Sequence, residues 1–472
     1  MRPGRTLMGR LIIVSNRTPG KGPAAGGLAV ALRKTLAERE GFWFGWSGKL
    51  VDAPSSEARF ESIDGLTVAQ IDLTRPDHHA YYAGFSNSIL WPSFHLRLDL
   101  ATIEGHWYEG YRAVNQQFAR ALLPHLRPDD IIWVHDYHLI PLASELRNLG
   151  ARNRIGFYLH IPFPTADALY AIPHHNELMR DLSRYDLVGM QAKRDVAAFT
   201  EFADHQSPSS ISGNPLKSVD FSRSETAAFP IGSDPDAFAS LAVSPAATKM
   251  VKRVERTLRE QRLILGVDRL DYSKGLPQRV EAYEKLLAND ARFRRVTHLM
   301  QIAPPSRDSI KEYQETSDAL DAICGRVMGR FAEPDWSPLT YVKRAYGQPS
   351  LAGLYRLARV GLVTPLRDGM NLVAHEFVGS QDPANPGVLV LSRFAGAAEI
   401  FPDAIMVNPF DTDETAEALR MALDMPLQER IDRWTTLMAA ARKYSVDNWS
   451  RNFLERLAPA ATSDSATARK TA

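Results

Sequence analysis

The clearest chemical signal in the sequence lies in residues 360–400, where a strand, a loop and a helix are expected to follow one another. Residues 360–364 form an apolar run typical of a buried parallel strand, and helical spacing of apolar residues begins again over 372–378. The loop 367–371 therefore precedes a helix start, where free backbone N–H groups and the helix dipole favour an anion. This order of elements predicts a phosphate or diphosphate site.

The first turn of that helix supplies contacts for a nucleotide. The amides of Met370, Asn371 and Leu372 can hold a diphosphate without any side chain. Glu376 lies one turn further on, where its carboxylate can accept hydrogen bonds from two vicinal ribose hydroxyls. These groups together suggest a bound nucleotide sugar. The alternative interpretation is that Asp368 or Asn371 serves only as a helix cap.

Basic residues follow two other apolar runs in the second half of the chain. Arg269 and Lys274 come after the predicted strand 263–267, and two cations there match the charge of a diphosphate. They would stabilise a nucleoside diphosphate as it leaves, although a pair of solvated basic side chains is the alternative. Arg307 follows the predicted strand 297–302, where an anion contact and a salt bridge are equally compatible with the sequence.

Polar residues also end two predicted strands of the first half. Asp136 and His138 follow the apolar run 131–134, and His160 follows the run 155–159. At the ends of parallel strands an aspartate can orient an acceptor hydroxyl, and a histidine can bind a sugar hydroxyl or the reacting oxygen. A histidine with a purely structural role in the core is the alternative.

The same histidines raise the question of a metal. Its ligands would be His135, His138 and His160 together with Asp136. Alternate residues of a strand point to opposite faces, so we expect His135 to face away from Asp136. We therefore predict no metal site.

The composition is that of an ordinary globular protein of 472 residues, with 44% hydrophobic residues, 24% charged residues and a formal net charge of +1. That charge, without a long Lys/Arg run, argues against nucleic acid as a partner. Only four apolar residues follow the basic start, too few for a signal peptide or a membrane span, so no membrane partner is expected. The single cysteine, Cys324, is expected to be a passive buried thiol in a cytoplasmic protein.

Short apolar runs alternate with amphipathic stretches along the chain, which predicts parallel sheets covered by helices. We expect an α/β fold of two Rossmann-like, doubly wound parallel-sheet domains that face each other across a cleft. The first domain is expected over residues 1–233, completed by a helix at about 446–458, and the second over 234–445. Residues 459–472 lack aromatic and large aliphatic side chains and are predicted to be a disordered tail.

Long motifs spread over the chain resemble those of one family. They are SNR at 15–17, FWFGWSG at 42–48, YYAGFSNSILWPSFH at 81–95, IIWVHDYHLIPLA at 131–143, NRIGFYLHIPFP at 153–164, RLDYSKGLPQR at 269–279, QIAPPSR at 301–307 and LRDGMNLVAHEFV at 366–378. From about residue 10 to residue 457 the chain resembles retaining glycosyltransferases of the trehalose-6-phosphate synthase type, in glycosyltransferase family 20. The resemblance implies the GT-B fold.

The resemblance also implies an acceptor site for glucose-6-phosphate. Its phosphate would contact Arg17, Tyr82, Trp91 and Arg307, and its hydroxyls would contact Asp136. Two cations, a phenol and an indole N–H can surround a phosphate dianion, and the aromatic faces can pack on a sugar ring.

A donor site for a nucleoside diphosphate glucose is implied as well, with UDP-glucose expected and an adenine or guanine base left open. The implied donor-binding residues are Gly27, Trp46, His160, Gln191, Arg269, Lys274, Asp368, Gly369, Met370, Asn371, Leu372, Val373 and Glu376. The implied catalytic residues are Asp136, His160, Arg269, Lys274 and Asp368.

The implied reaction is a front-face displacement that yields α,α-trehalose 6-phosphate. The anomeric hydroxyl of the acceptor attacks on the side from which the diphosphate leaves, and a phosphate oxygen accepts its proton, so neither a protein nucleophile nor a metal cofactor is required. Two alternatives stay open: a sugar-phosphate glycosyltransferase with another acceptor, of the glucosylglycerol phosphate or pseudo-sugar type, and a non-catalytic regulatory relative. A homo-oligomer, either a dimer or a tetramer, is compatible with the sequence. Residues 411–415 (DTDET) mimic a phosphatase motif but are predicted to be a helix cap.

Overall fold

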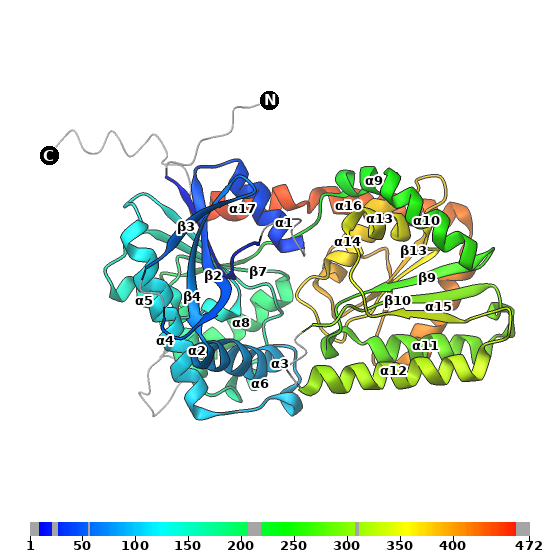
Figure 1. Ribbon diagram of the computed structural model, residues 1–472, viewed down its shortest axis with the longest axis horizontal. Coiled ribbons are helices and arrows are strands. Elements are labelled where there is room, and N and C mark those ends of the chain that lie inside the picture. Colours follow the sequence, from blue (N-terminus) through cyan, green and yellow to red (C-terminus); the bar gives the residue numbers. More distant parts are fainter. Residues whose placement is uncertain (1–8, 21–26, 55–56, 206–218, 307–310, 459–472) are drawn as a thin grey trace. The chain divides into compact units, whose positions relative to one another are not determined.

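The computed structural model describes residues 9–20, 27–54, 57–205, 219–306 and 311–458. The chain forms two compact units, each containing one parallel-dominated sheet (Figure 1). Unit 1 comprises Met1–Phe229 and Asp447–Ala472, and unit 2 comprises Pro230–Val446. The predicted acceptor residue Arg307 and the predicted tail 459–472 lie outside the described residues.

In the described part of unit 1, eight strands form a sheet with the order β3-β4-β2-β1-β5-β6-β7-β8. Neighbouring strands run parallel except β3 and β4, which pair antiparallel. Strand β5 is buried along its whole length, as expected for a parallel strand covered on both faces. The strands are β1 Leu11–Arg17, β2 Gly41–Val51, β3 Arg59–Ile63, β4 Leu66–Thr74, β5 Ile131–His135, β6 Arg154–Tyr158, β7 Leu187–Met190 and β8 Glu225–Ala228.

Helices connect most of the parallel strands of unit 1. They are α1 Gly27–Ala37, α2 Arg75–His78, α3 Trp91–Phe94, α4 Gly105–Leu122, α5 Leu142–Asn148, α6 Ala166–Tyr170, α7 His175–Leu182, α8 Lys193–His205 and α17 Val446–Leu457, with the short helices η2 Leu98–Leu100, η3 Leu123–His125 and η4 Tyr137–Leu139. Between α2 and α3 the backbone forms the π-helix η1, His79–Leu90. Wide π-helical turns are rare and are often found at functional sites, and η1 carries Tyr82 and leads directly to Trp91.

The helix α17 belongs to unit 1 although it lies near the end of the chain. Gly156 on β6 and Gly189 on β7 make room for Phe453, because a Cβ at these glycines would lie 2.8 and 2.7 Å from its ring. Trp449 and Phe453 pack against Trp133 of β5, with ring centroids 4.8 and 4.7 Å away. The strand glycines therefore let the aromatic face of α17 complete the core of unit 1.

The part of unit 2 that the structure describes contains a six-stranded parallel sheet with the order β11-β10-β9-β12-β13-β14. The strands are β9 Arg262–Val267, β10 Thr297–Ile302, β11 Leu339–Val342, β12 Val360–Val363, β13 Val388–Ser392 and β14 Ile405–Val407. Strands β9 and β12 are neighbours although β10 and β11 lie between them in the sequence. The strand order reverses at this pair, which is where open α/β sheets bind ligands beyond their carboxyl ends.

Helices cover both faces of this sheet (Figure 1). They are α9 Pro235–Ala242, α10 Pro245–Leu258, α11 Leu276–Asn289, α12 Lys311–Phe331, α13 Gln348–Leu357, α14 Leu372–Ser380, α15 Thr412–Asp424 and α16 Leu427–Lys443, with the short helices η5 Tyr272–Lys274, η6 Ala291–Phe293 and η7 Gly396–Glu399. On one face the buried side chains of α11, α12 and α15 form a single core with the strands, including Ile264, Leu299, Leu320, Leu362 and Leu419. This packed face holds the strand ends of unit 2 in fixed register.

Two sequence predictions about reactive residues are confirmed in unit 2. Cys324 of α12 is buried, and burial raises the pKa of its thiol to about 12, so the thiolate is scarce at neutral pH. The side chain of Asp411 accepts hydrogen bonds from the amides of Asp413 and Glu414, which makes it the N-cap of α15. Across the described ranges, we find no helix with the length and apolar character needed to cross a membrane.

Candidate active site

The loops that follow β9 and β12 meet at the carboxyl edge of the unit 2 sheet. A backbone hydrogen bond of 2.8 Å from Leu366 N to Ser273 O joins them. Gly275 has a φ of 64° at this contact, and a Cβ there would lie 2.5 Å from Thr364 O. Because only glycine fits, the sequence SKG places Lys274 directly beside the second loop.

Lys274 and Asp368 form an ion pair across the two loops, between Nζ and Oδ2. Both side chains are largely buried, with exposures of 11% and 14%. The sequence predicts Lys274 as a cation facing a phosphate but does not predict this carboxylate partner. Arg269, in contrast, is exposed, with its Nη1 3.4 Å from Ser306 Oγ, so it presents positive charge at the rim of the same loop.

The start of α14 has the geometry of an anion site. Asn371 is its N-cap, with a φ of 81° and Oδ1 accepting the Val373 N–H at 3.2 Å. Within the described residues, the amides of Met370, Asn371 and Leu372 donate to no backbone carbonyl, whereas Val373 N–H is used by the cap. Gly369 and Met370, within the loop, are buried. The cap and the anion site are therefore compatible, because they use different N–H groups.

Glu376 lies one turn into α14, as predicted, and its Oε2 accepts a hydrogen bond of 3.2 Å from Tyr355 Oη. Desolvation raises the pKa of Glu376 to about 7, only partly offset by the tyrosine. Its carboxylate form, which accepts hydrogen bonds from hydroxyls, therefore becomes dominant only above neutral pH.

In unit 1, Asp136 directly follows β5 in an unusual backbone conformation, with φ of 78° and ψ of 163°. Its N–H donates to Tyr158 O at 2.8 Å, and its Oδ1 accepts the His160 N–H at 3.2 Å. These two bonds tie Asp136 to the end of the neighbouring strand β6. A non-glycine residue in this region of φ and ψ is strained, which is a feature often found at functional sites.

His160 lies between two polar side chains of unit 1. Its Nε2 is 3.1 Å from His135 Nδ1, and its Nδ1 is 3.4 Å from Gln191 Nε2. Burial lowers the pKa of His160 to about 3, and that of His135 well below its usual value, so both rings are neutral at pH 7. His138 packs on Tyr82 instead, with ring centroids 5.7 Å apart. The described residues contain no group of three or more potential metal ligands.

The predicted acceptor residues Arg17 and Tyr82 lie in a row of rings that also includes the predicted donor residue Trp46. The Arg17 guanidinium lies 5.6 Å from the Trp46 ring, Trp46 lies 4.9 Å from His78, and His78 stacks on Tyr82 at 5.1 Å. Gly48 leaves the space for Arg17, since a Cβ there would lie 2.5 Å from the guanidinium. The row combines a cation, which can contact a phosphate, with aromatic faces, which can pack on a sugar ring.

Two other predicted residues lie at the ends of helices. Trp91 opens α3 and is buried, with its ring 5.8 Å from that of Tyr137, next to Asp136 in sequence. Gly27 is the first residue of α1.

Four residues near these groups were not predicted from the sequence. His78 completes the aromatic row, Tyr355 contacts Glu376, and Asp268 and Arg279 form a buried pair below Asn371. Asp268 could have been noticed, because it directly follows a predicted strand. Arg279 could not, because an arginine within a helix ordinarily points to solvent.

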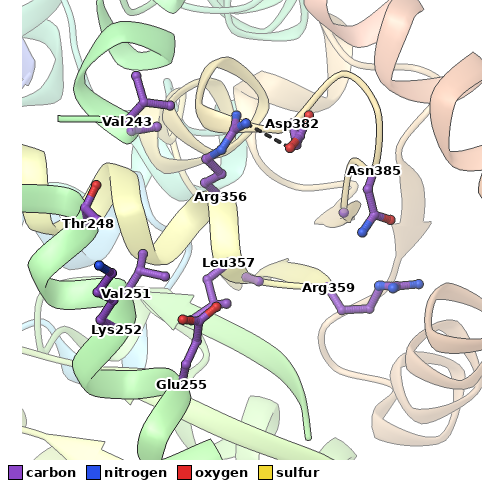
Figure 2. Close-up of a pocket in the computed structure, with 13 residues that line it drawn as sticks. Val243, Thr248, Val251, Lys252, Glu255, Arg356, Leu357, Arg359, Asp382 and Asn385 are labelled. Carbon is purple, nitrogen blue, oxygen red and sulfur yellow. Dashed lines mark ion pairs between the residues drawn. The ribbon is translucent and has the colours of Figure 1, made fainter. Parts of the chain in front are cut away.

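A separate cavity of about 480 Å³ lies at the other edge of the unit 2 sheet (Figure 2). Its lining includes Arg359 and Gly387, which precede β12 and β13, so it lies at the amino ends of the strands. Arg356 in this cavity pairs with Asp382 at 2.8 Å. Ligands of open α/β sheets bind at the opposite, carboxyl edge, so we do not include this cavity in the candidate site.

Comparison with known proteins places this geometry in a family. The family model described as glycosyltransferase family 20 matches residues 16–459. The chain is 48% identical over 458 residues to a trehalose-6-phosphate synthase of Sinorhizobium fredii, covering 95% of this chain and 98% of the relative. It is 44% identical over 455 residues to a trehalose-6-phosphate synthase of an Enterobacter species, covering 95% of each. The chain belongs to glycosyltransferase family 20.

Solved structures agree with this assignment. One is an α,α-trehalose-phosphate synthase (UDP-forming) from Burkholderia xenovorans in complex with glucose-6-phosphate, with a TM-score of 0.90, 48% identity and coverage of 95% of this chain and 100% of that chain. Another, from E. coli and bound with UDP-2-fluoro glucose, has a TM-score of 0.89, 42% identity and coverage of 95% and 99%. These matches confirm the predicted α/β, GT-B fold class.

Proposed function

We propose that this chain is a retaining glucosyltransferase that moves glucose from UDP-glucose to glucose-6-phosphate and releases UDP and α,α-trehalose 6-phosphate. The observation that carries the proposal is the meeting of Lys274, Asp368 and the start of α14 at the switch point of the unit 2 sheet. There, three backbone amides and a buried lysine are arranged for a diphosphate. Relatives that are 44–48% identical to the chain over 95% of its length, and named for this activity, support it.

In the donor half, the diphosphate lies against Arg269, Lys274 and the amides of Asn371 and Leu372. Glu376 accepts hydrogen bonds from the ribose hydroxyls. As the bond between the sugar and the diphosphate breaks, negative charge builds on the leaving oxygen. Positive groups fixed in advance at that place stabilise the transition state more than the ground state.

In the acceptor half, Arg17, Tyr82 and Trp91 bind the phosphate of glucose-6-phosphate, together with Arg307 from outside the described residues. Asp136 accepts hydrogen bonds from the sugar hydroxyls. The hydrogen bonds to Tyr158 and His160 support this role, because they hold the carboxylate at the end of β5. Because the carboxylate is already fixed, it can orient the acceptor without losing conformational entropy of its own at each turnover.

The proposed mechanism is displacement on the front face of the donor sugar. The anomeric hydroxyl of the acceptor attacks as the diphosphate leaves on the same side, and a diphosphate oxygen takes its proton. Burial keeps the His160 ring neutral, and the ring lies between His135 and Gln191, so we assign it a polar contact with the donor glucose and no positive charge. The proposed reaction uses no metal ion, because Arg269 and Lys274 neutralise the diphosphate. Turnover should therefore persist in EDTA.

The test is nucleoside diphosphate release with glucose-6-phosphate as acceptor and UDP-, ADP- or GDP-glucose as donor. We expect UDP-glucose to be preferred and the product to be a phosphorylated, non-reducing disaccharide whose one glycosidic linkage is α at both anomeric carbons. Turnover with glycerol phosphate or a pseudo-sugar phosphate, but not with glucose-6-phosphate, would show that the proposed acceptor is wrong. Tight UDP-glucose binding without turnover on any acceptor would instead favour a regulatory protein.

A further inference from the structure

A buried charge network lies beneath the loop at the start of α14. Arg279 of α11 donates from Nη2 to Asp268 Oδ2 at 2.8 Å, and these side chains are 0% and 4% exposed. Its Nη1 donates to Gln301 Oε1 at 3.0 Å, and its Nε donates to Thr364 Oγ1 at 3.1 Å. One guanidinium thus joins residues at the carboxyl ends of β9, β10 and β12, and each of its three nitrogens donates a hydrogen bond, as a buried charge requires.

The network continues to the candidate site through one amide. Asn371 Nδ2 lies 3.3 Å from Asp268 Oδ1 and 3.1 Å from Asp368 Oδ2, and Asp368 in turn pairs with Lys274. The other amide atom, Asn371 Oδ1, accepts the Val373 N–H at 3.2 Å. Every hydrogen-bonding atom of the Asn371 amide therefore has a protein partner, and the two carboxylates determine which way the amide faces.

This orientation matters because Asn371 has a left-handed backbone, with φ of 81° and ψ of 86°. A residue with a Cβ rarely adopts such a conformation, although Asn does so more readily than most, and side-chain hydrogen bonds help to hold it there. The side-chain bonds to Asp268 and Val373 do so here, and they set the direction of the three unused amides and of the Asp368–Lys274 pair.

We propose that Arg279 and Asp268 are positioning residues of the transfer reaction, which hold the start of α14 and Lys274 in place for the diphosphate by way of Asn371. The inference rests on the proposed function, since it assigns the diphosphate to this loop. Asp268 uses one oxygen for Arg279 and the other for Asn371, so a side chain with a single acceptor oxygen cannot satisfy both.

The test is Asp268→Asn, which keeps the shape of the side chain but replaces one acceptor with a donor. If that donor faces Asn371, the Asn371 amide must flip and give up its bond to Val373; if it faces Arg279, a buried hydrogen bond is lost. We expect kcat/KM for UDP-glucose to fall at least tenfold and the affinity for UDP to fall, with KM for glucose-6-phosphate within twofold of wild type.

The matched control is Asp130→Asn in unit 1. Asp130 is also buried and likewise serves two partners: Oδ1 accepts from Arg10 Nε at 3.0 Å, and Oδ2 accepts from Arg10 Nη2 at 2.8 Å and from the Arg127 N–H at 2.7 Å. Asp130 precedes β5, however, at the amino edge of its sheet. We expect a comparable loss of melting temperature in this variant, with kcat/KM within twofold of wild type. If Asp268→Asn behaves in the same way as Asp130→Asn in kinetics and in UDP binding, the proposal is overturned.

A second variant covers the case in which Asp268→Asn does not fold. A Cβ on Gly266 would lie 2.6 Å from both Arg279 Nη1 and Gln301 Oε1, so Gly266→Ala displaces Arg279 without removing a charge. It should lower kcat/KM for UDP-glucose in the same direction, and an unchanged value would overturn the proposal. If wild type itself shows no transfer, the proposed function fails. Calorimetric titration of UDP into wild type, Gly266→Ala and Asp130→Asn still tests the network: weaker UDP binding in Gly266→Ala alone would support it, and equal binding in all three would overturn it.

Discussion

The strained backbone of Asp136 allows two variants to distinguish the loss of its carboxylate from the relief of its backbone strain. Its φ of 78° and ψ of 163° lie in a region almost restricted to glycine, at a cost of about 1 to 3 kcal/mol for other residues. The proposed role requires a carboxylate at this point, so the strain persists. Replacing Asp136 with glycine or alanine removes the carboxylate in both cases, but only glycine removes the strain.

We predict that Asp136→Gly is more stable than Asp136→Ala, the reverse of the usual order. Glycine relieves about 1 to 3 kcal/mol of strain but loses about 0.5 to 1 kcal/mol more chain entropy on folding than alanine. The net difference is about 1 kcal/mol in the free energy of unfolding, or about 2 to 4 °C in melting temperature for a unit of this size.

Differential scanning calorimetry of the two variants measures this difference, and the transfer assay measures their activity. Both variants should lose at least tenfold in kcat/KM for glucose-6-phosphate. Ala101→Gly is the control, because Ala101 has an ordinary φ of −75° and glycine there should lower stability. An Asp136→Ala variant as stable as Asp136→Gly would refute the strain argument, and retained activity in both would refute the acceptor role.

Three further predictions concern unit 2. Arg269→Ala and Lys274→Ala should each lower turnover more than tenfold, because losing one contact to transition-state charge commonly costs about 3 kcal/mol; near-normal rates in both would contradict the diphosphate site. Donor affinity, measured by titration with UDP-glucose, should weaken as the pH falls below about 7, because Glu376 then takes up a proton. The Glu376→Gln variant should bind UDP-glucose weakly at every pH. An affinity that still changes with pH in this variant would show that another group titrates. His375→Leu should raise the melting temperature, because His375 is buried and neither ring nitrogen has a hydrogen-bond partner in the described parts of the chain, which costs about 1 to 3 kcal/mol. Burial lowers the pKa of His375 to about 3, so wild type loses stability as the pH falls below about 6.5 and the variant should lose less. A difference in melting temperature between the variant and wild type that is larger at pH 8 than at pH 5 would contradict this.

Much of the site could be predicted because it lies at the ends of strands. Apolar runs mark strands by local spacing, and Asp136, Arg269 and the loop 367–371 lie within a few residues after such runs. Parallel strands bring those ends to one edge of each sheet. The helix start at Leu372 and the carboxylate of Glu376 one turn later follow from the same local spacing.

Other features depended on contacts that no local pattern records. Tyr355 and Glu376 lie on different helices, and His78 of α2 meets Trp46 only because β4, which precedes α2, pairs with β2. The strain at Asp136 is likewise invisible in the sequence, since it is held by bonds to Tyr158 at the end of β6 and to His160 just beyond it.

The sequence by itself determined the class of fold, the strand ends and the residue types available for a nucleotide sugar, because all of these are carried by spacing over a few residues. Only the tertiary structure decided that Lys274 pairs with Asp368, 94 residues away, and that Arg279 is buried below them. The reason is the strand order of unit 2. Strands β9 and β12 are neighbours because β10 and β11 lie on the other side of β9, and no local spacing encodes that arrangement.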